Sequence, residues 1–327
     1  MRARVYVTQP VAASALKRLR AAAKVTVNPD SSRILPKKAL CAVLPRHDIL
    51  FSLLHDRVDR DVLAANPKLR AVTSMAITPD AIDVAEATAR GIPVTVVPPI
   101  VGEATADLNF GLMIAVARRV RDGDGLLRKG GFPGSQSNHL AGAAVSGKVL
   151  GLVGGGGRIG RAVAKRAHGF GMQVLYWGPR RKPARDEQDF GLTYVPFDEL
   201  LRQSDFVSLH PPLTEETRHM ISDRELALMK PTAFLINTAR GPIVDEAALV
   251  RALTRKRIAG AGIDVFEHEP KVAPALRKMA NVVLTPHMGS AVASLREVMA
   301  NIVVDNILAI LDGRPPPNCI NPQVLDR

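Results

Sequence analysis

The chain has 327 residues, 46% of them hydrophobic, and a formal net charge of +13. This length exceeds the usual span of one domain, so we expect two domains with packed cores. The 44 lysines and arginines are scattered and only 4% of the residues are aromatic, so we expect a solvated basic surface and no nucleic-acid partner.

The first 98 residues alternate short apolar runs with helical patterns, which predicts an α/β fold with a mostly parallel sheet. The N-terminal run resembles a strand and lacks the features of a secretory signal, and no apolar run approaches the roughly 20 residues that span a membrane. The lack of such a run predicts no membrane association, and the presence of only two cysteines, Cys41 and Cys319, fits a reducing compartment, so we expect the cytoplasm. The predicted strands are 4–7, 25–27, 49–53, 69–74 and 94–97, and the predicted helices are 11–23, 59–65 and 82–90.

The pair of prolines at 98 and 99 marks a boundary. After it, residues 102–121 predict one long helix with one apolar face, formed by Leu108, Leu112, Ala115 and Val116. The polar, glycine-rich stretch 122–142 predicts a surface loop or short helix.

From residue 149 the alternation of strands and helices begins again. The predicted strands are 149–153, 173–176, 206–209, 233–237, 262–265 and 282–284, and the predicted helices are 161–170, 197–203, 222–229 and 246–255. A last helical pattern, at about 292–311, could return the chain to the first domain. We therefore predict a dinucleotide-binding domain, residues 99–291, inserted into a discontinuous substrate-binding domain made of residues 1–98 and 292–327.

A glycine cluster follows the strand predicted at 149–153. Gly155, Gly157 and Gly160 satisfy the pattern G-x-G-x-x-G, with Arg158 and Ile159 between the last two glycines. This pattern, placed between a strand and a helix, favours a dinucleotide whose pyrophosphate lies at the helix N-terminus.

The turn after the next strand indicates which dinucleotide is bound. An acidic residue usually ends this strand and binds the ribose 2′-hydroxyl of NAD, but here the strand is followed by Gly178-Pro-Arg-Arg-Lys182. Arg180 and Arg181 would attract a 2′-phosphate, so we predict NADP(H). NAD(H) stays open as the alternative, because Asp186 and Glu187 could serve it if the turn folds back.

Three polar segments, 237–246, 264–270 and 285–290, follow the last predicted strands. Ligands in open α/β sheets bind at the carboxyl ends of strands, so these segments should bring Arg240, Glu269 and His287 towards one cleft. A histidine there can give a proton to a substrate oxygen, a paired glutamate would favour the imidazolium form, and an arginine can grip a keto acid.

These segments read N-T-A-R-G-P-I-V-D-E, D-V-F-E-H-E-P and T-P-H-M-G-S, and with G-x-G-R-I-G at 155–160 they resemble the D-isomer-specific 2-hydroxyacid dehydrogenases. The resemblance implies two Rossmann-like or flavodoxin-like domains with the active-site cleft between them, and usually a homodimer. It assigns catalysis to Arg240, Glu269 and His287. It also places Thr105, Thr238 and Asp264 at the cofactor, and Ser290 with the backbone of Ile77 and Thr78 at the substrate.

Two departures from the family pattern affect details of the site. The glycine turn is one residue longer than usual, so either the strand ends later or the loop bulges. The loop expected to hold the substrate carboxylate reads Ala76-Ile-Thr-Pro-Asp80 and lacks the usual glycines, which leaves the substrate open. The loop 210–212 resembles the family segment beneath the adenosine, and we expect backbone contacts there with no role for the His210 ring.

The sequence therefore predicts an oxidoreductase that transfers a hydride between NADP(H) and a small 2-oxo or 2-hydroxy acid of the glyoxylate, hydroxypyruvate or 2-ketogluconate type. The turn at 178–182 most resembles glyoxylate/hydroxypyruvate reductases. A sister activity, such as phosphite or phosphoglycerate oxidation, and a non-catalytic nucleotide sensor are the alternatives. The histidines that are given no role show no ligand spacing, so no metal is expected; they are His47, His55, His139, His168, His219 and His268.

Overall fold

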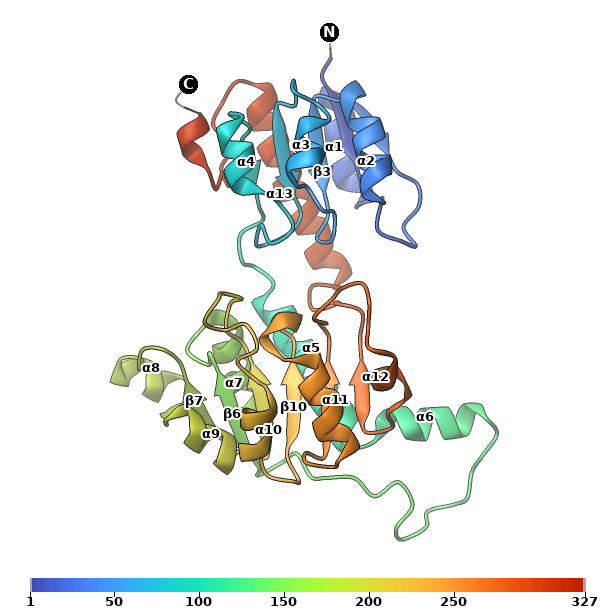
Figure 1. Ribbon diagram of the computed structural model, residues 1–327, viewed down its shortest axis with the longest axis vertical. Coiled ribbons are helices and arrows are strands. Elements are labelled where there is room, and N and C mark those ends of the chain that lie inside the picture. Colours follow the sequence, from blue (N-terminus) through green and yellow to red (C-terminus); the bar gives the residue numbers. More distant parts are fainter. Residues whose placement is uncertain (1, 326–327) are drawn as a thin grey trace. The chain divides into compact units, whose positions relative to one another are not determined.

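The computed structural model describes residues 2–325. The chain divides into two compact units, Met1–Ile100 with Ala291–Arg327, and Val101–Ser290 (Figure 1). Both units have a parallel sheet covered by helices, which confirms the predicted α/β class. Among the described residues, none of the helices is both long enough and apolar enough to span a membrane.

The first unit contains a five-stranded sheet in the order β2-β1-β3-β4-β5, the order of flavodoxin-like folds. All of its strand pairs are parallel, and Val5 of β1 lies opposite Val25 on one side and Ile49 on the other. The central strands are almost entirely buried and most of their residues are apolar, as expected for a sheet covered on both faces. The strands are β1 (Arg4–Val7), β2 (Lys24–Val27), β3 (Ile49–Ser52), β4 (Ala71–Ser74) and β5 (Val94–Thr95).

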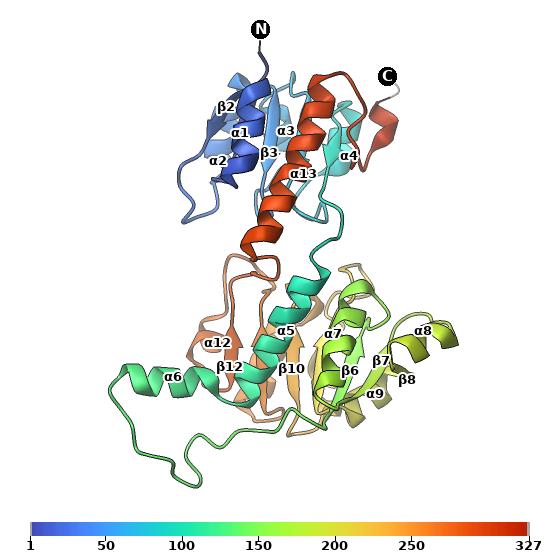
Figure 2. The same ribbon diagram turned by 180° about the vertical axis from the view of Figure 1, so that it is seen from behind.

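Helices from both ends of the chain cover the first sheet. The C-terminal helix α13 packs beside α1, and Arg18 of α1 binds Asn301 and Asp305 of α13 at 2.8 and 2.6 Å (Figure 2). The helices are α1 (Ala13–Ala22), α2 (Lys37–Val43), α3 (Arg60–Ala64), α4 (Val84–Ala89) and α13 (Ala293–Leu311), with short 3₁₀ turns η1 (Leu44–Arg46) and η3 (Pro322–Val324).

The second unit contains a seven-stranded parallel sheet in the order β12-β11-β10-β9-β6-β7-β8, one strand more than the six predicted. The extra strand, β8, has only two residues and follows a helix that the sequence pattern did not reveal. The strands are β6 (Val149–Val153), β7 (Gln173–Trp177), β8 (Thr193–Tyr194), β9 (Phe206–Leu209), β10 (Phe234–Asn237), β11 (Gly260–Ile263) and β12 (Val282–Leu284).

Two apolar clusters cover the faces of this second sheet. Helices α5 and α7 pack on one face (Figure 2), while α9, α10 and α11 pack on the other (Figure 1). The helices are α5 (Gly102–Ala117), α6 (Val120–Arg128), α7 (Arg158–Gly169), α8 (Ala184–Asp189), α9 (Phe197–Gln203), α10 (Asp223–Leu228), α11 (Glu246–Thr254) and α12 (Pro274–Lys278), with the 3₁₀ turn η2 (Gly241–Ile243).

The single helix predicted over 102–121 is wrong. Arg119 adopts a left-handed backbone conformation (φ 55°), which ends α5, and α6 begins one residue later in another direction (Figures 1 and 2). Ion pairs of Arg119 with Asp122 and of Arg128 with Asp124 support α6 despite its two glycines.

The apolar face predicted for this helix is also displaced. Leu112 and Val116 are buried, but Leu108 and Ala115 are only half-buried. Instead, the buried face of α5 includes two polar side chains, Thr105 and Asn109. A polar residue on the face of a helix that packs against a sheet indicates a buried hydrogen-bond network, and both side chains lie near the candidate site.

Candidate active site

The candidate site of the second unit lies at the carboxyl ends of its strands. β6 pairs with β7 on one side and β9 on the other, so the chain builds the sheet outward in both directions from this strand. Such a switch point is where open α/β sheets bind ligands. The segments that follow β6, β7, β9, β10, β11 and β12 therefore supply the residues considered below.

The glycine turn takes up the extra residue as a bulge. β6 ends at Val153, as predicted, and Gly154 has a left-handed backbone (φ 76°) that favours glycine. A Cβ at Gly154 would lie 2.8 Å from the backbone nitrogen of Pro211, and a Cβ at Gly156 would overlap the side chain of Lys182. The turn thus needs glycine at 154, where the backbone is left-handed and the backbone of the 210–211 segment lies directly against it, whereas at 156 only the flexible Lys182 side chain would have to move.

The turn leads straight into the N-terminus of α7. Gly157 is the cap residue and, within residues 2–325, no side chain caps this end. The predicted contacts Arg158 and Ile159 form the first turn, and a Cβ at Gly160 would overlap the backbone of Gly155. A helix end with uncapped N–H groups beside a glycine cradle fits the diphosphate of a dinucleotide.

Tyr176 and Glu187 organise the basic turn after β7. The Tyr176 ring is buried, and its hydroxyl donates to the Glu187 carboxylate (2.7 Å) and accepts from the Lys182 amide (2.8 Å). Glu187 also accepts two hydrogen bonds from Arg181, both 2.9 Å. These bonds lower the pKa of Glu187 to about 2, with the hydrogen bond from Arg181 as the largest cause.

Both carboxylates that could have served NAD are therefore bound to arginines. Glu187 does fold back towards the turn, but it holds Arg181, while Asp186 pairs with Arg161 of α7. The predicted phosphate contacts Arg180 and Arg181 are both exposed. Tyr176 was missed at the sequence level, because a tyrosine within an apolar strand looks like any other core residue.

Arg240 follows β10 and begins the turn η2. The Asn237 side chain donates to the Arg240 carbonyl (3.0 Å), and the Arg240 guanidinium donates to the Ala239 carbonyl (2.7 Å). The side chain of Arg240 is half-buried. Its backbone is therefore held at the end of the strand by a buried asparagine from the same strand.

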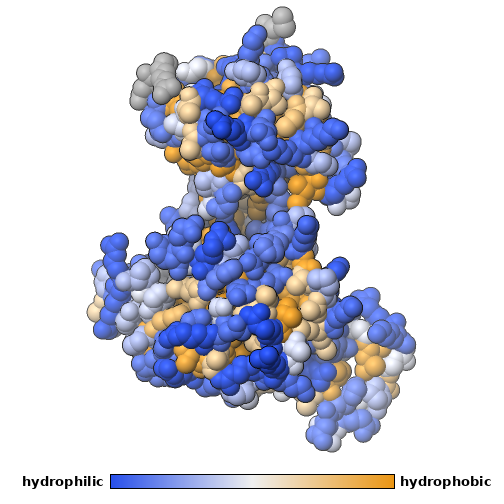
Figure 3. Space-filling model, viewed as in Figure 1, coloured by the Kyte–Doolittle hydropathy of each residue, from blue (hydrophilic) through white to orange (hydrophobic). Residues whose placement is uncertain are grey.

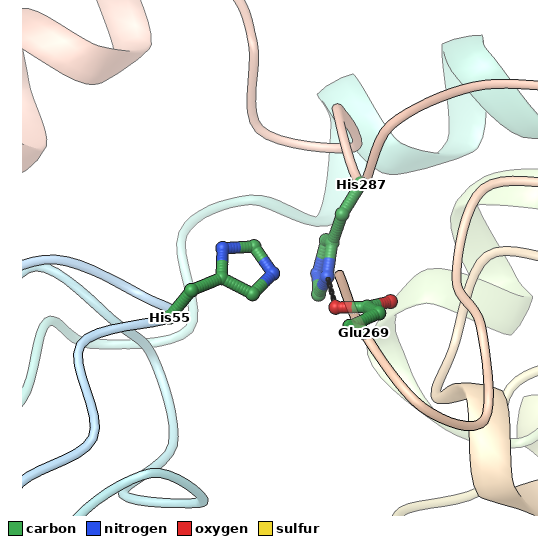
Figure 4. Close-up of side chains that lie close together, drawn as sticks. All are labelled: His55, Glu269 and His287. Atoms are coloured by element: carbon green, nitrogen blue, oxygen red, sulfur yellow. Dashed lines mark hydrogen bonds and ion pairs between the residues drawn. The ribbon is translucent and has the colours of Figure 1, made fainter. Parts of the chain in front are cut away.

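Glu269 and His287 form a hydrogen-bonded pair. His287 Nδ1 lies 2.9 Å from Glu269 Oε2, and the two side chains are 21% and 19% exposed (Figure 4). The other Glu269 oxygen accepts from the Phe266 amide at 2.9 Å, which orients the carboxylate. Because a carboxylate accepts hydrogen bonds, Nδ1 carries the proton of this bond and Nε2 is the ring atom on the opposite side.

The loop that carries His287 is bound to Asp264. The Asp264 carboxylate is 1% exposed and accepts from the Thr285 hydroxyl (2.6 Å) and the amides of Met288 (2.8 Å) and Gly289 (3.0 Å). The His287 amide donates to the Asp264 carbonyl at 2.8 Å. Asp264 therefore shapes the loop around His287.

A buried polar network lies between α5 and the ends of β9 and β10. Asn109 Nδ2 donates to the hydroxyls of Ser208 (2.8 Å) and Thr238 (3.1 Å), and Ser208 Oγ lies 3.0 Å from His210 Nε2. Thr105 donates weakly to the Gly289 carbonyl at 3.4 Å. Of these residues, the sequence analysis singled out Thr105 and Thr238 but missed Asn109 and Ser208. The one signal for Asn109 is its polar side chain on the buried face of α5.

The predicted substrate contacts fall in both units. Ser290 is half-buried at the end of the His287 loop in the second unit. Ile77 and Thr78 lie in the first unit, in the bend after β4, where the Thr78 hydroxyl donates to Asp80 at 2.9 Å.

These features define a nicotinamide dinucleotide-dependent oxidoreductase. A model of the D-isomer specific 2-hydroxyacid dehydrogenase NAD binding domain matches residues 110–289, which include the glycine turn, Arg240, Glu269 and His287. The chain belongs to the D-isomer-specific 2-hydroxyacid dehydrogenase family, which confirms the resemblance. This family membership means that the cofactor is a nicotinamide dinucleotide and that the reaction is a hydride transfer involving a 2-oxo or 2-hydroxy acid.

Several known proteins are similar over the whole length. The chain is 44% identical to a glyoxylate reductase of Thermococcus litoralis, over 99% of this chain and 98% of that protein. It is 45% identical to a glyoxylate reductase of Korarchaeum cryptofilum, with the same coverage. Among solved structures, an NADPH-dependent glyoxylate/hydroxypyruvate reductase of Sinorhizobium meliloti in complex with NADP and malonate is 31% identical, with a TM-score of 0.80 and 98% and 97% of the two chains covered.

Proposed function

We propose that this protein is an NADP(H)-dependent reductase of small 2-oxo acids of the glyoxylate, hydroxypyruvate or 2-ketogluconate type. The observation that carries the proposal is the Glu269–His287 pair, which lies in the same unit as the glycine turn and Arg240. The names of the similar proteins support the substrate class, since both glyoxylate reductases match over nearly the whole chain.

The reduction needs a hydride, a proton and a group that binds the keto acid, and the chain supplies the last two. A bound nicotinamide dinucleotide would supply the hydride for the keto carbon. His287 Nε2 gives a proton to the keto oxygen, because Glu269 holds Nδ1 and so fixes which nitrogen faces the substrate. Arg240 binds the substrate carboxylate and polarises the keto oxygen through its several N–H donors. The hydride and the proton together convert the 2-oxo acid into the 2-hydroxy acid.

The test of this chemistry compares two histidine–glutamate pairs. His287→Asn should lower kcat by at least about a thousandfold, because it removes the proton donor, while dinucleotide binding is retained. His219→Asn is the matched control, since His219 Nε2 lies 2.7 Å from Glu267 in the same unit but is assigned no step. NADPH oxidation with a panel of 2-oxo acids measures both variants. If NADPH binds tightly and none of the acids turns over, the nucleotide-sensor alternative is favoured instead.

Preference for NADP(H) rests on the turn after β7. It offers three cations, and Glu187 uses only the Nε and one Nη group of Arg181, so a guanidinium with five N–H groups keeps donors for a phosphate. The binding of Asp186 to Arg161 further reduces the acidic groups that could accept a ribose hydroxyl. NADP in the complex of the Sinorhizobium meliloti enzyme supports the same preference.

The cofactor test is a double substitution. Arg180→Ala with Arg181→Ala should raise KM for NADPH by about tenfold or more and spare KM for NADH, because only NADPH has a 2′-phosphate for the arginines. Arg185→Ala is the matched control, since Arg185 is an exposed arginine of the following helix that pairs with Asp189. Equal increases for both cofactors would contradict the assignment.

The homodimer and the cytoplasmic location are parts of the same proposal. Helix α6 and the segment after it extend from the second sheet, and three of their apolar side chains, Val120, Leu127 and Phe132, are 52%, 56% and 79% exposed (Figures 1 and 3). An exposed apolar surface of this kind is typical of a contact with a second copy of the chain. The two cysteines, neither in a disulfide, are in keeping with a reducing compartment.

A further inference from the structure

His210 is a buried histidine to which the proposed chemistry assigns no step. It follows β9 at the switch point of the second sheet, and its amide donates to the Val153 carbonyl at 2.8 Å. Its carbonyl carbon lies only 2.9 Å from the position that a Cβ on Gly154 would occupy. The residue is therefore built against the first glycine of the turn that receives the dinucleotide.

The hydrogen bonds around the ring determine its tautomer. Asn109 donates to the Ser208 hydroxyl, so the single hydrogen of that hydroxyl is available for His210 Nε2, 3.0 Å away. Nε2 is then the acceptor, and the ring proton is on Nδ1. Burial lowers the pKa of His210 to about 3, so the ring is neutral near neutral pH and carries this one proton.

The Nδ1 atom of this ring is one of four buried side-chain polar atoms without a hydrogen-bond partner in the part of the chain that the structure describes. A buried N–H donor without an acceptor costs free energy, so such atoms in native proteins usually meet a ligand or an ordered water. Here the donor belongs to a residue in direct contact with the glycine turn.

We propose that the His210 ring is a cofactor-binding group, whose Nδ1–H donates a hydrogen bond to an oxygen of the nicotinamide-side phosphate or of the nicotinamide-side ribose of the bound dinucleotide. Ser208 and Asn109 are positioning residues, because their hydrogen bonds hold the proton on Nδ1. The inference rests on the proposed function, since it takes the dinucleotide as the ligand of this turn. It assigns the side chain a role where the sequence indicated only backbone contacts.

Binding measurements test the proposal without the enzymatic reaction. Trp177 is the only tryptophan, at the end of β7 in the same unit, so its fluorescence reports titration of the full-length protein with a nucleotide. The probes are NADPH, ADP-ribose, which lacks the nicotinamide and the 2′-phosphate, and 2′,5′-ADP, which lacks the second phosphate of the diphosphate bridge and the nicotinamide-side ribose. Wild-type binding of NADPH tests the proposed function, whereas the ratio of variant to wild-type Kd tests the role of His210.

His210→Phe keeps a flat ring but removes the donor. It should raise Kd for NADPH and ADP-ribose by on the order of tenfold and leave Kd for 2′,5′-ADP within about twofold of wild type, because only the first two ligands carry the acceptor oxygen. His210→Asn, whose amide nitrogen can replace Nδ1 as donor, should restore most of the affinity. Unchanged Kd values in His210→Phe would overturn the proposal, and so would an equal loss for all three ligands, which indicates a collapsed loop.

Nitrogen NMR of histidine-labelled wild-type protein provides a second test that needs no variant. The His210 signals should show a neutral ring protonated at Nδ1, and saturation with ADP-ribose should shift the Nδ1 proton downfield. A ring protonated at Nε2, or an Nδ1 signal that does not move on saturation, would refute the assignment even if His210→Phe fails to fold.

Discussion

Removing the Asp264 carboxylate should release the loop that carries His287. Asp264→Ala removes the carboxylate that accepts hydrogen bonds from the Thr285 hydroxyl and from two loop amides. Gly289 is buried, so its amide cannot simply turn to water. The substitution therefore acts on the position of the proton donor and leaves the donor itself in place.

The size of the effect follows from the number of bonds lost. A hydrogen bond to a charged group contributes about 1.5–3 kcal/mol, so two amide bonds give roughly 3–6 kcal/mol of local stability. We expect a loss of about 3 kcal/mol, at the low end, because the exposed Met288 amide regains water on opening. That loss corresponds to about a hundredfold faster amide exchange in the loop.

Hydrogen exchange at Met288 and Gly289 measures this effect directly. Asp245→Ala is the control, because the Asp245 carboxylate also accepts a hydrogen bond from a backbone amide, that of Ala248, but it caps α11 and does not touch the loop. The control should speed exchange in α11 only. Wild-type exchange rates at both loop amides in Asp264→Ala would refute the argument that this carboxylate holds the loop.

Three further predictions concern stability, cofactor binding and assembly. The folded-state pKa of His210 lies below its usual value of 6.5, so the contribution of this histidine to stability is complete above pH 6.5 and is lost as the pH falls towards 3. Between pH 7.5 and 5, the free energy of unfolding, measured by Trp177 fluorescence, should therefore drop by about 2 kcal/mol less in His210→Phe than in wild type. Equal drops in the two proteins would contradict this. Gly160→Ala should abolish NADPH binding in a titration, because the new Cβ would overlap the backbone of the glycine turn, and wild-type affinity would show that the turn can move aside. Leu127→Glu with Phe132→Glu should convert a dimer into a monomer in analytical ultracentrifugation, and a variant that sediments as wild type would exclude this surface from the contact.

The sequence alone was enough for the fold class, because parallel strands with both faces covered are short apolar runs that alternate with helices. β1, β6, β9 and β12 have the predicted bounds. The order of the motifs along the chain also brought Arg240, Glu269 and His287 into consideration together. The structure gives the hydrogen bond between Glu269 and His287, while the catalytic roles of all three residues stay predictions.

Tertiary structure decided what depends on groups distant in sequence. The helical pattern of the sequence continues past residue 117, but α5 ends there, and the left-handed backbone of Arg119 separates it from α6. The same holds for Glu187, whose attachment to Arg181 and Tyr176 depends on how the turn after β7 folds back. The state of His210 depends on Ser208 and on Asn109 of a distant helix, since burial and hydrogen bonds, and not the residue type, determine where a histidine holds its proton.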